Sequence, residues 1–241
     1  MRVRTLAPLI SLSLALATGP AMAQQNVDKV FGGITAQAGQ KYGSLDTVNG
    51  GITIREGAEV ESAETVNGGI SIDDKARVGS AETVNGGISL GEQATAGSVE
   101  AVNGGIQLAR GARVERDIEA VNGGIKVAAQ AEVGGDVGNV NGAITLAGAR
   151  VGGDVTTTNG DIVLSDGARI DGGILVEKPS SSWFNSGDKR VPRIVIGADS
   201  VVGGSLVFEH EVELFVHPTA KIGPVTGATP RAFTDTLPAR D

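Results

Sequence analysis

One short motif recurs along most of this chain and constrains its fold more than any other feature. Val-Asn-Gly-Gly or a close variant occurs seven times, and successive Asn residues are 18 or 19 positions apart. A fixed period of this length is typical of a solenoid, in which each repeat forms one turn and packs against its neighbours. The Asn residues are Asn49, Asn67, Asn85, Asn103, Asn122, Asn141 and Asn159, and Phe31 stands in the equivalent place one unit earlier.

A shorter period runs inside each repeat, because apolar residues recur at every sixth position. A helix cannot produce this spacing, and the frequent Gly and charged residues exclude long strands. Three six-residue sides per turn predict an all-β, single-domain triangular parallel β-helix of roughly ten turns, which we expect to be right-handed. The series predicted to point inward is Val48, Ile54, Val60, Val66, Ile72, Val78, Val84, Leu90, Ala96, Val102, Leu108 and Val114.

Two further columns should also fill the core. Residues two places before a member of the series point to the same side of a strand, because side chains alternate. These are Ile52, Ile70, Ile88, Ile106, Ile125 and Ile144. The third side is predicted to be filled by Ala63, Ala81, Val99, Ile118, Val137 and Val155.

The composition agrees with a narrow aliphatic interior. The chain has 37 Gly but only five Phe, one Tyr and one Trp. Gly has no three-residue period, which excludes collagen, and the 40% of hydrophobic residues argues against disorder. The absence of Cys excludes disulfides and thiolate metal sites. A formal charge of −8 with no basic cluster argues against nucleic-acid binding.

The first 23 residues have the pattern of a secretory signal peptide. Arg2 and Arg4 precede an uncharged apolar stretch, and Ala21 and Ala23 supply the small residues that a signal peptidase reads. A retained membrane anchor would need about 20 spanning residues, more than this stretch offers. We therefore expect cleavage after Ala23 and an exported mature chain without a transmembrane segment, located in the periplasm, on the cell surface or outside the cell.

The repeated Asn is predicted to be structural. Asn tolerates left-handed backbone angles, the glycines after it can form a sharp corner, and stacked amides can bond from turn to turn. The alternative is a row of ligand contacts, but the Asn is joined to corner glycines in each unit. We therefore predict a structural Asn ladder.

Acidic residues form a second column, two places before the Val of the motif. We call it the acidic ridge, and its predicted members are Asp46, Glu64, Glu82, Glu100 and Glu119. One interpretation is a solvated face whose charge is partly balanced by Arg77, Arg113, Arg150 and Arg169 on another side. The other is a site for a divalent cation, which prefers several carboxylate oxygens. The calcium-binding nonapeptide of other β-helices is absent.

The repeat is interrupted at residues 178–193, which contain two prolines and the adjacent Trp183 and Phe184. Such an excursion from a rigid scaffold is a candidate interaction loop, or a cover for an exposed turn. The repeat spacing then resumes. We predict a β-helix over residues 24–225 and a flexible tail over residues 226–241.

Residues 131–137, 149–155 and 200–206 resemble the GA-x-V-x-G-D-I turns of bactofilins, and the VNGGI turns resemble adhesin-like β-solenoids of bacterial envelopes. Bactofilins are cytoskeletal β-helices that polymerise end to end without nucleotide, so the resemblance implies this fold and self-assembly. The predicted export departs from most bactofilins, which act inside the cell.

No catalytic residue or cofactor site is predicted. The two histidines, His210 and His217, are seven residues apart and do not match a zinc motif. The sequence favours a non-enzymatic structural or interaction protein of the bacterial envelope, with itself, an envelope polysaccharide or an envelope protein as partner. The alternative is a carbohydrate-active β-helix enzyme or a carbohydrate-binding module that uses the acidic ridge or the Trp183 loop.

Overall fold

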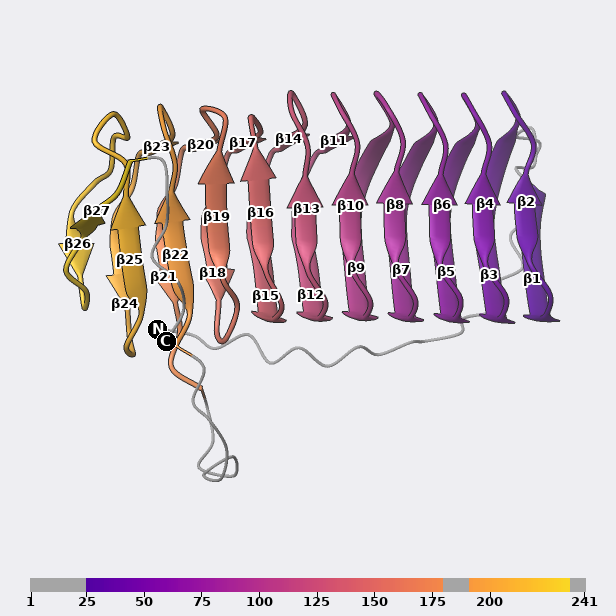
Figure 1. Cartoon of the computed structure of the whole chain (residues 1–241). Helices are drawn as coiled ribbons and strands as arrows, with labels where there is room; N and C mark the ends of the chain where they lie inside the picture. Colours follow the sequence, from indigo (N-terminus) through magenta and orange to yellow (C-terminus); the bar gives the residue numbers. More distant parts are fainter. Residues whose placement is uncertain (1–24, 180–190, 235–241) are drawn as a thin grey trace.

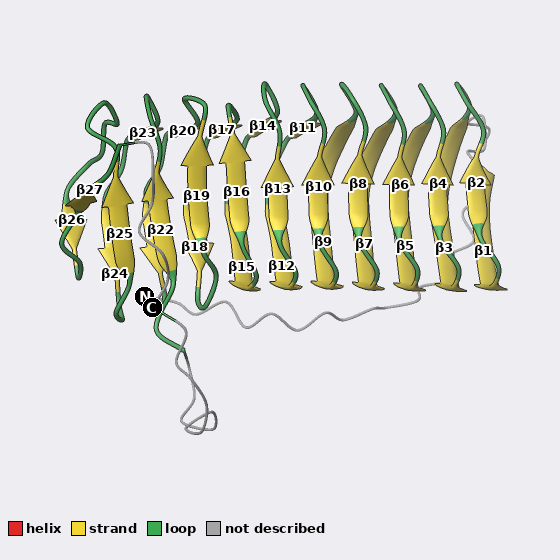
Figure 2. Ribbon diagram, in the orientation of Figure 1, coloured by secondary structure: helices red, strands yellow, loops and turns green. Residues whose placement is uncertain are grey.

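A computed structural model describes residues 25–179 and 191–234, which form one parallel β-solenoid (Figure 1). The described part is all-β, so it contains no helix of the length and apolarity that a membrane span requires (Figure 2). One sheet has 11 strands, one per turn, close to the number of turns expected. Its strands are β2 (Ile34–Ala36), β4 (Ile52–Ile54), β6 (Ile70–Ile72), β8 (Ile88–Leu90), β10 (Ile106–Leu108), β13 (Ile125–Val127), β16 (Ile144–Ala147), β19 (Ile162–Ser165), β22 (Arg193–Ile196), β25 (Glu213–Val216) and β27 (Arg231–Ala232).

The other two sides of each turn belong to a 16-stranded sheet. In the first turns a single long strand covers both sides: β1 (Gln25–Phe31), β3 (Lys41–Asn49), β5 (Glu59–Asn67), β7 (Arg77–Asn85) and β9 (Thr95–Asn103). In later turns the strand divides in two: β11 (Arg113–Val114) and β12 (Ile118–Asn122), β14 (Glu132–Val133) and β15 (Val137–Asn141), β17 (Arg150–Val151) and β18 (Val155–Thr157), β20 (Arg169–Ile170) and β21 (Ile174–Val176), β23 (Val201–Val202) and β24 (Leu206–Phe208). The sheet ends with β26 (Val225–Thr226).

The core is a set of stacked aliphatic columns. In the 11-stranded sheet, the first and third residues of a strand such as β4 are buried and the middle residue faces outward. The predicted Ile column is buried throughout, from Ile52 to Ile144. The predicted third-side column is also confirmed, since its members from Ala63 to Val155 have no exposed surface.

The six-residue series places one residue on each of the three sides of a turn, and it was wrong on one side, at the Val that precedes the repeated Asn. Val48 is 40% exposed, and Val66, Val84 and Val102 are only half-buried on the outer face. Thr47, Thr65 and Thr83 point inward instead and are 4% exposed. The reason is the alternation within a strand: Ala63 faces inward and Glu64 outward, so the next inward place belongs to Thr65.

The corner that follows the repeated Asn does not depend on left-handed backbone angles, as the sequence had suggested. Asn85 and Gly86 do not have positive φ angles; those occur mainly at another corner, for example at Gly57 and Lys75. The motif needs glycine because of the close approach of stacked turns. A Cβ built on Gly86 would lie 2.0 Å from the carbonyl oxygen of Gly68.

The described residues include only some of the predicted domain boundaries. Trp183 and Phe184 lie outside the described residues, as does the predicted signal peptide, residues 1–23. At the C-terminal end, β27 (Arg231–Ala232) pairs in parallel with β25, so paired strands continue past the boundary predicted at residue 225. The predicted right hand of the coil stays a prediction.

Candidate interaction surfaces

The acidic ridge forms as one continuous column. Its predicted members are in direct register on successive strands, from Asp46 on β3 to Glu119 on β12. The column has one more member, Asp28 on β1, which pairs with Asp46. Asp28 was missed because the first unit lacks the Asn, although it lies 18 residues before Asp46.

Stacking alters the acidity of the ridge. Partial burial, a hydrogen bond with Asp28 and the charges of Glu64 and Asp28 raise the pKa of Asp46 from 3.8 to about 6. Burial and the charges of Glu100 and Glu64 also raise the pKa of Glu82. A carboxyl group with a pKa near 6 is partly protonated at that pH and can share its proton with its neighbour. This sharing lessens the charge repulsion along the acidic ridge.

The ridge has few positive neighbours. Within the described residues no ion pair joins Asp46, Glu64, Glu82 or Glu100 to Lys or Arg. Arg116 lies alongside, and its guanidinium donates to Ser98 Oγ at 3.1 Å. In residues 25–179 and 191–234 no three His, Asp or Glu residues form a group that could hold a metal ion. A straight column differs in this respect from the convergent oxygen ligands that Ca²⁺ prefers.

The Asn residues form the predicted ladder. Each Nδ2 from Asn67 to Asn159 donates to Oδ1 of the Asn one turn earlier, at 2.9–3.0 Å. At the start, Asn49 Nδ2 donates instead to the carbonyl oxygen of Val30 at 3.4 Å. Each of these amides uses one of its two N–H donors to bond to the preceding turn, which agrees with a structural role.

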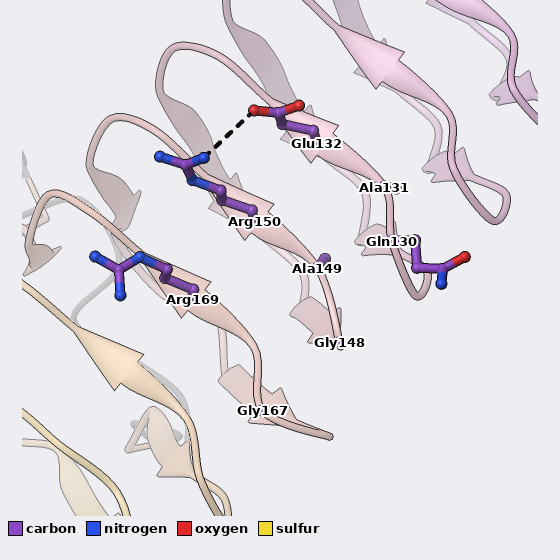
Figure 3. Close-up of a pocket in the computed structure, with 8 residues that line it drawn as sticks. All are labelled: Gln130, Ala131, Glu132, Gly148, Ala149, Arg150, Gly167 and Arg169. Atoms are coloured by element: carbon purple, nitrogen blue, oxygen red, sulfur yellow. Dashed lines mark ion pairs between the residues drawn. The ribbon is translucent and has the colours of Figure 1, made fainter.

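The predicted Arg residues lie on another side, in register with acidic residues. Glu132 pairs with Arg113 and, at 3.8 Å, with Arg150. Asp171 binds both Arg150 at 2.6 Å and Arg169 at 2.5 Å, and these hydrogen bonds lower the pKa of the Asp171 carboxyl. A shallow hollow of about 330 Å³ lies over this column (Figure 3). Its charged groups are occupied with one another and join successive turns.

A second hollow, of about 500 Å³, lies on the outer face of the 11-stranded sheet. Ser89, Gln107, Lys126 and Thr145 are in register there on four successive strands. Small residues beside them, Ala109, Ala128 and Ala147, leave the space open. Lys126 forms no ion pair within the described residues. This surface was not predicted from the sequence, although its alanines recur there at 19-residue intervals.

The two histidines lie near the C-terminal end of the coil, His210 just after β24 and His217 just after β25. His210 Nε2 bonds to the carbonyl oxygen of Thr158 at 2.9 Å. His217 Nδ1 is 3.0 Å from Thr219 Oγ1, and its ring lies against Phe233 with centroids 5.7 Å apart. Both therefore have structural partners.

These features define the class of protein as a parallel β-solenoid with long, regular outer faces. Comparisons of the chain with protein-family models, with curated proteins and with solved structures found no match. The resemblance to bactofilin and adhesin-like turns is therefore one of repeat pattern, carried by the residues quoted for it.

Proposed function

We propose that this protein is a non-enzymatic structural or interaction protein of the bacterial cell envelope, exported by its first 23 residues. It serves as a rigid rod whose outer faces assemble, adhere or are displayed. The observation that carries this proposal is the unbroken register of the coil. Seven Asn residues and six acidic residues are each aligned over successive turns.

The same regularity leaves little room for an enclosed site. In the described residues, turns from β3 to β21 differ by at most one residue in length, and the two hollows are shallow. Enzymes bind substrates in clefts that remove most of the ligand from water. A rod with flat, repeated faces fits instead a partner that is itself extended, such as a polymer or a second rod.

Fractionation of cells that express the full chain, together with negative-stain microscopy of the purified protein, tests the proposal. We expect the protein in the envelope or secreted fraction, as rods or as lateral assemblies. A protein that stays in the cytoplasm, or one that depolymerises pectin or alginate, would overturn the proposal.

A second candidate function is carbohydrate binding, favoured by the hollow around Lys126. Hydroxyl, amide and ammonium groups in a row along the coil axis suit the hydroxyls and carboxylates of an acidic polysaccharide. The probe is a set of oligogalacturonates titrated into the protein by calorimetry. We expect binding that weakens at least tenfold in Lys126→Ala and is unchanged in Lys75→Ala, an exposed Lys on another turn. Absence of heat for the wild type would end this candidate.

A further inference from the structure

The first turn differs from those that follow it at the inward place before the glycine corner. Thr47, Thr65 and Thr83 fill this place in the next three turns, and each hydroxyl donates to a glycine carbonyl of the preceding turn at 2.8–3.2 Å. In the first turn the residue in register with Thr47 is Lys29. A charged side chain therefore stands where the other turns have a small buried one.

The ammonium group of Lys29 occupies a specific acceptor. Lys29 Nζ donates to the carbonyl oxygen of Gly33 at 2.8 Å. In later turns the equivalent carbonyl, such as that of Gly51 or Gly69, accepts from the Ile N–H of the preceding turn at 2.9–3.0 Å. Gly33 is the one member of this column within the described residues that has no earlier Ile, and Lys29 bonds to it instead. Lys29 thus fills the acceptor that an added turn would use.

The Asn ladder ends at the same turn. Phe31 pairs in register with Asn49 but has no amide, and its side chain is 78% exposed. Gly32, which follows it, has a φ of 95°, whereas the corner glycines of the next turns do not have positive φ. The amide column and the corner conformation both change where Lys29 is found.

We propose that Lys29 makes the first turn a stop, which prevents β1 of a second copy of this chain from pairing with the edge of β1 that has no partner strand within the described residues. Inward-pointing charges and edge lysines are a known means by which sheets avoid pairing at their edges. A strand laid on β1 would displace the ammonium from Gly33 and enclose it between two apolar layers. This inference does not depend on the proposed function, and it predicts that assembly proceeds through the outer faces rather than through this end.

The test is Lys29→Thr in the full chain, which restores the residue found in the next three turns. We expect the variant to dimerise at concentrations at which the wild type does not, as measured by light scattering after size-exclusion chromatography. Lys29→Arg retains a cationic donor and should behave as the wild type. Lys41→Thr removes a different exposed Lys, paired with Glu59 at 2.6 Å, and should not change the mass either.

A folded Lys29→Thr protein with the wild-type mass would overturn the proposal. If that variant fails to fold, Lys29→Met keeps the methylene chain, removes the ammonium and gives the same two outcomes. Since the chain has no Cys, Val30→Cys added to Lys29→Thr locates the contact. A disulfide-linked dimer supports pairing between the two β1 edges, whereas a dimer in which the β1 amides exchange with solvent as fast as in the wild type places the contact elsewhere and contradicts the proposal. The envelope fractionation reads a different property, so the two proposals can fail separately.

Discussion

The early and late turns of this coil pass the same corner in two different ways. From β3 to β9 a single strand continues through the corner, whereas from β11 onward the strand divides and one residue is inserted. In the divided turns Asp117 and Asp136 are at the corner, and their Oδ1 atoms accept from the backbone N–H of the next turn at 2.8 Å. A turn can therefore be one residue longer when an Asp carboxylate at the corner accepts a hydrogen bond from the next turn, in place of the continuous strand pairing of the early turns.

Both regions nevertheless keep the glycine corner after the Asn. The first glycine of the pair, as at Gly86 or Gly123, lies so close to the preceding turn that a Cβ would be 1.9–2.0 Å from its carbonyl oxygen. The second glycine is less constrained, and Ala143 occupies that place in one turn. From Gly32 to Gly160 this first glycine is therefore the corner residue common to every turn, whereas Glu211 stands at the equivalent place near the C-terminal end.

The largest expected effect comes from Gly86→Ala. Its Cβ would overlap the Gly68 carbonyl, so the two turns must separate, and we expect a loss of about 3 kcal/mol or more in the free energy of unfolding. Gly87→Ala is the matched control, with a Cβ 3.0 Å from Gly105 O, and should change stability by about 1 kcal/mol or less. Urea unfolding followed by circular dichroism compares them. Equal losses would contradict the steric account.

A smaller loss is expected from Asp136→Ala, which removes the carboxylate that replaces backbone pairing in the divided turns. A hydrogen bond to an exposed charged group contributes about 1 kcal/mol. Asp136→Asn retains an acceptor oxygen and should recover part of it. Hydrogen exchange at the Asp154 amide reports the bond directly. Unchanged protection of this amide in Asp136→Ala would show that the carboxylate has no such role.

Proteins usually lose stability as the pH falls. The acidic ridge of the early turns should have the opposite effect and raise the free energy of unfolding in mild acid. The pKa of Asp46 is about 6 in the folded chain against 3.8 ordinarily, so between about pH 6 and 4 the folded state binds more protons than the unfolded state. Stability should therefore rise as the pH falls from 7 to 5. Further acidification removes the stabilisation from Asp171, whose pKa is lowered.

Glu82→Gln tests the charge repulsion in the acidic ridge at neutral pH. The raised pKa of Glu82 means that its negative charge destabilises the folded state. After allowance for solvent screening we expect a gain of about 0.5–1 kcal/mol at pH 7 that disappears near pH 4. Glu92→Gln, at an exposed corner, is the control and should be neutral. A Glu82→Gln protein less stable than the wild type at pH 7 would refute the repulsion.

The smallest expected effect is a gain in the free energy of unfolding from a substitution in the late turns, at Ser200. Ser200 is fully buried, and its hydroxyl has no hydrogen-bond partner in the described residues. Earlier turns have Ala at the same place, for example Ala149 and Ala168. Ser200→Ala should raise the free energy of unfolding by about 0.5 kcal/mol, measurable as a small rise in Tm. A decrease would mean that the hydroxyl has a partner, such as buried water.

The period of the sequence was sufficient to predict the parallel coil, the Ile and Ala columns, the Asn ladder and the register of the ridge. It failed at Val66 because counting in sixes treats the three sides as equivalent, whereas the pleat of each strand decides which residues face inward. The role of Lys29 could not be predicted from periodicity, since it depends on which carbonyl is left without a partner at an end. The hollow at Lys126 depends on three-dimensional packing of small side chains in the same way.

The Asn ladder also gives the rod an electrical direction. All of its amides donate toward the N-terminal end, so their dipoles add along the axis, with the positive pole near Asn49 and the negative pole near Asn159. Four of the six ridge carboxylates, from Asp46 to Glu100, lie in the turns of Asn49 to Asn103, toward the positive end of this column, and Asp28 lies one turn beyond that end. The two ends of the rod are therefore not electrostatically equivalent, and in an external field or beside a charged surface the rod has a preferred orientation.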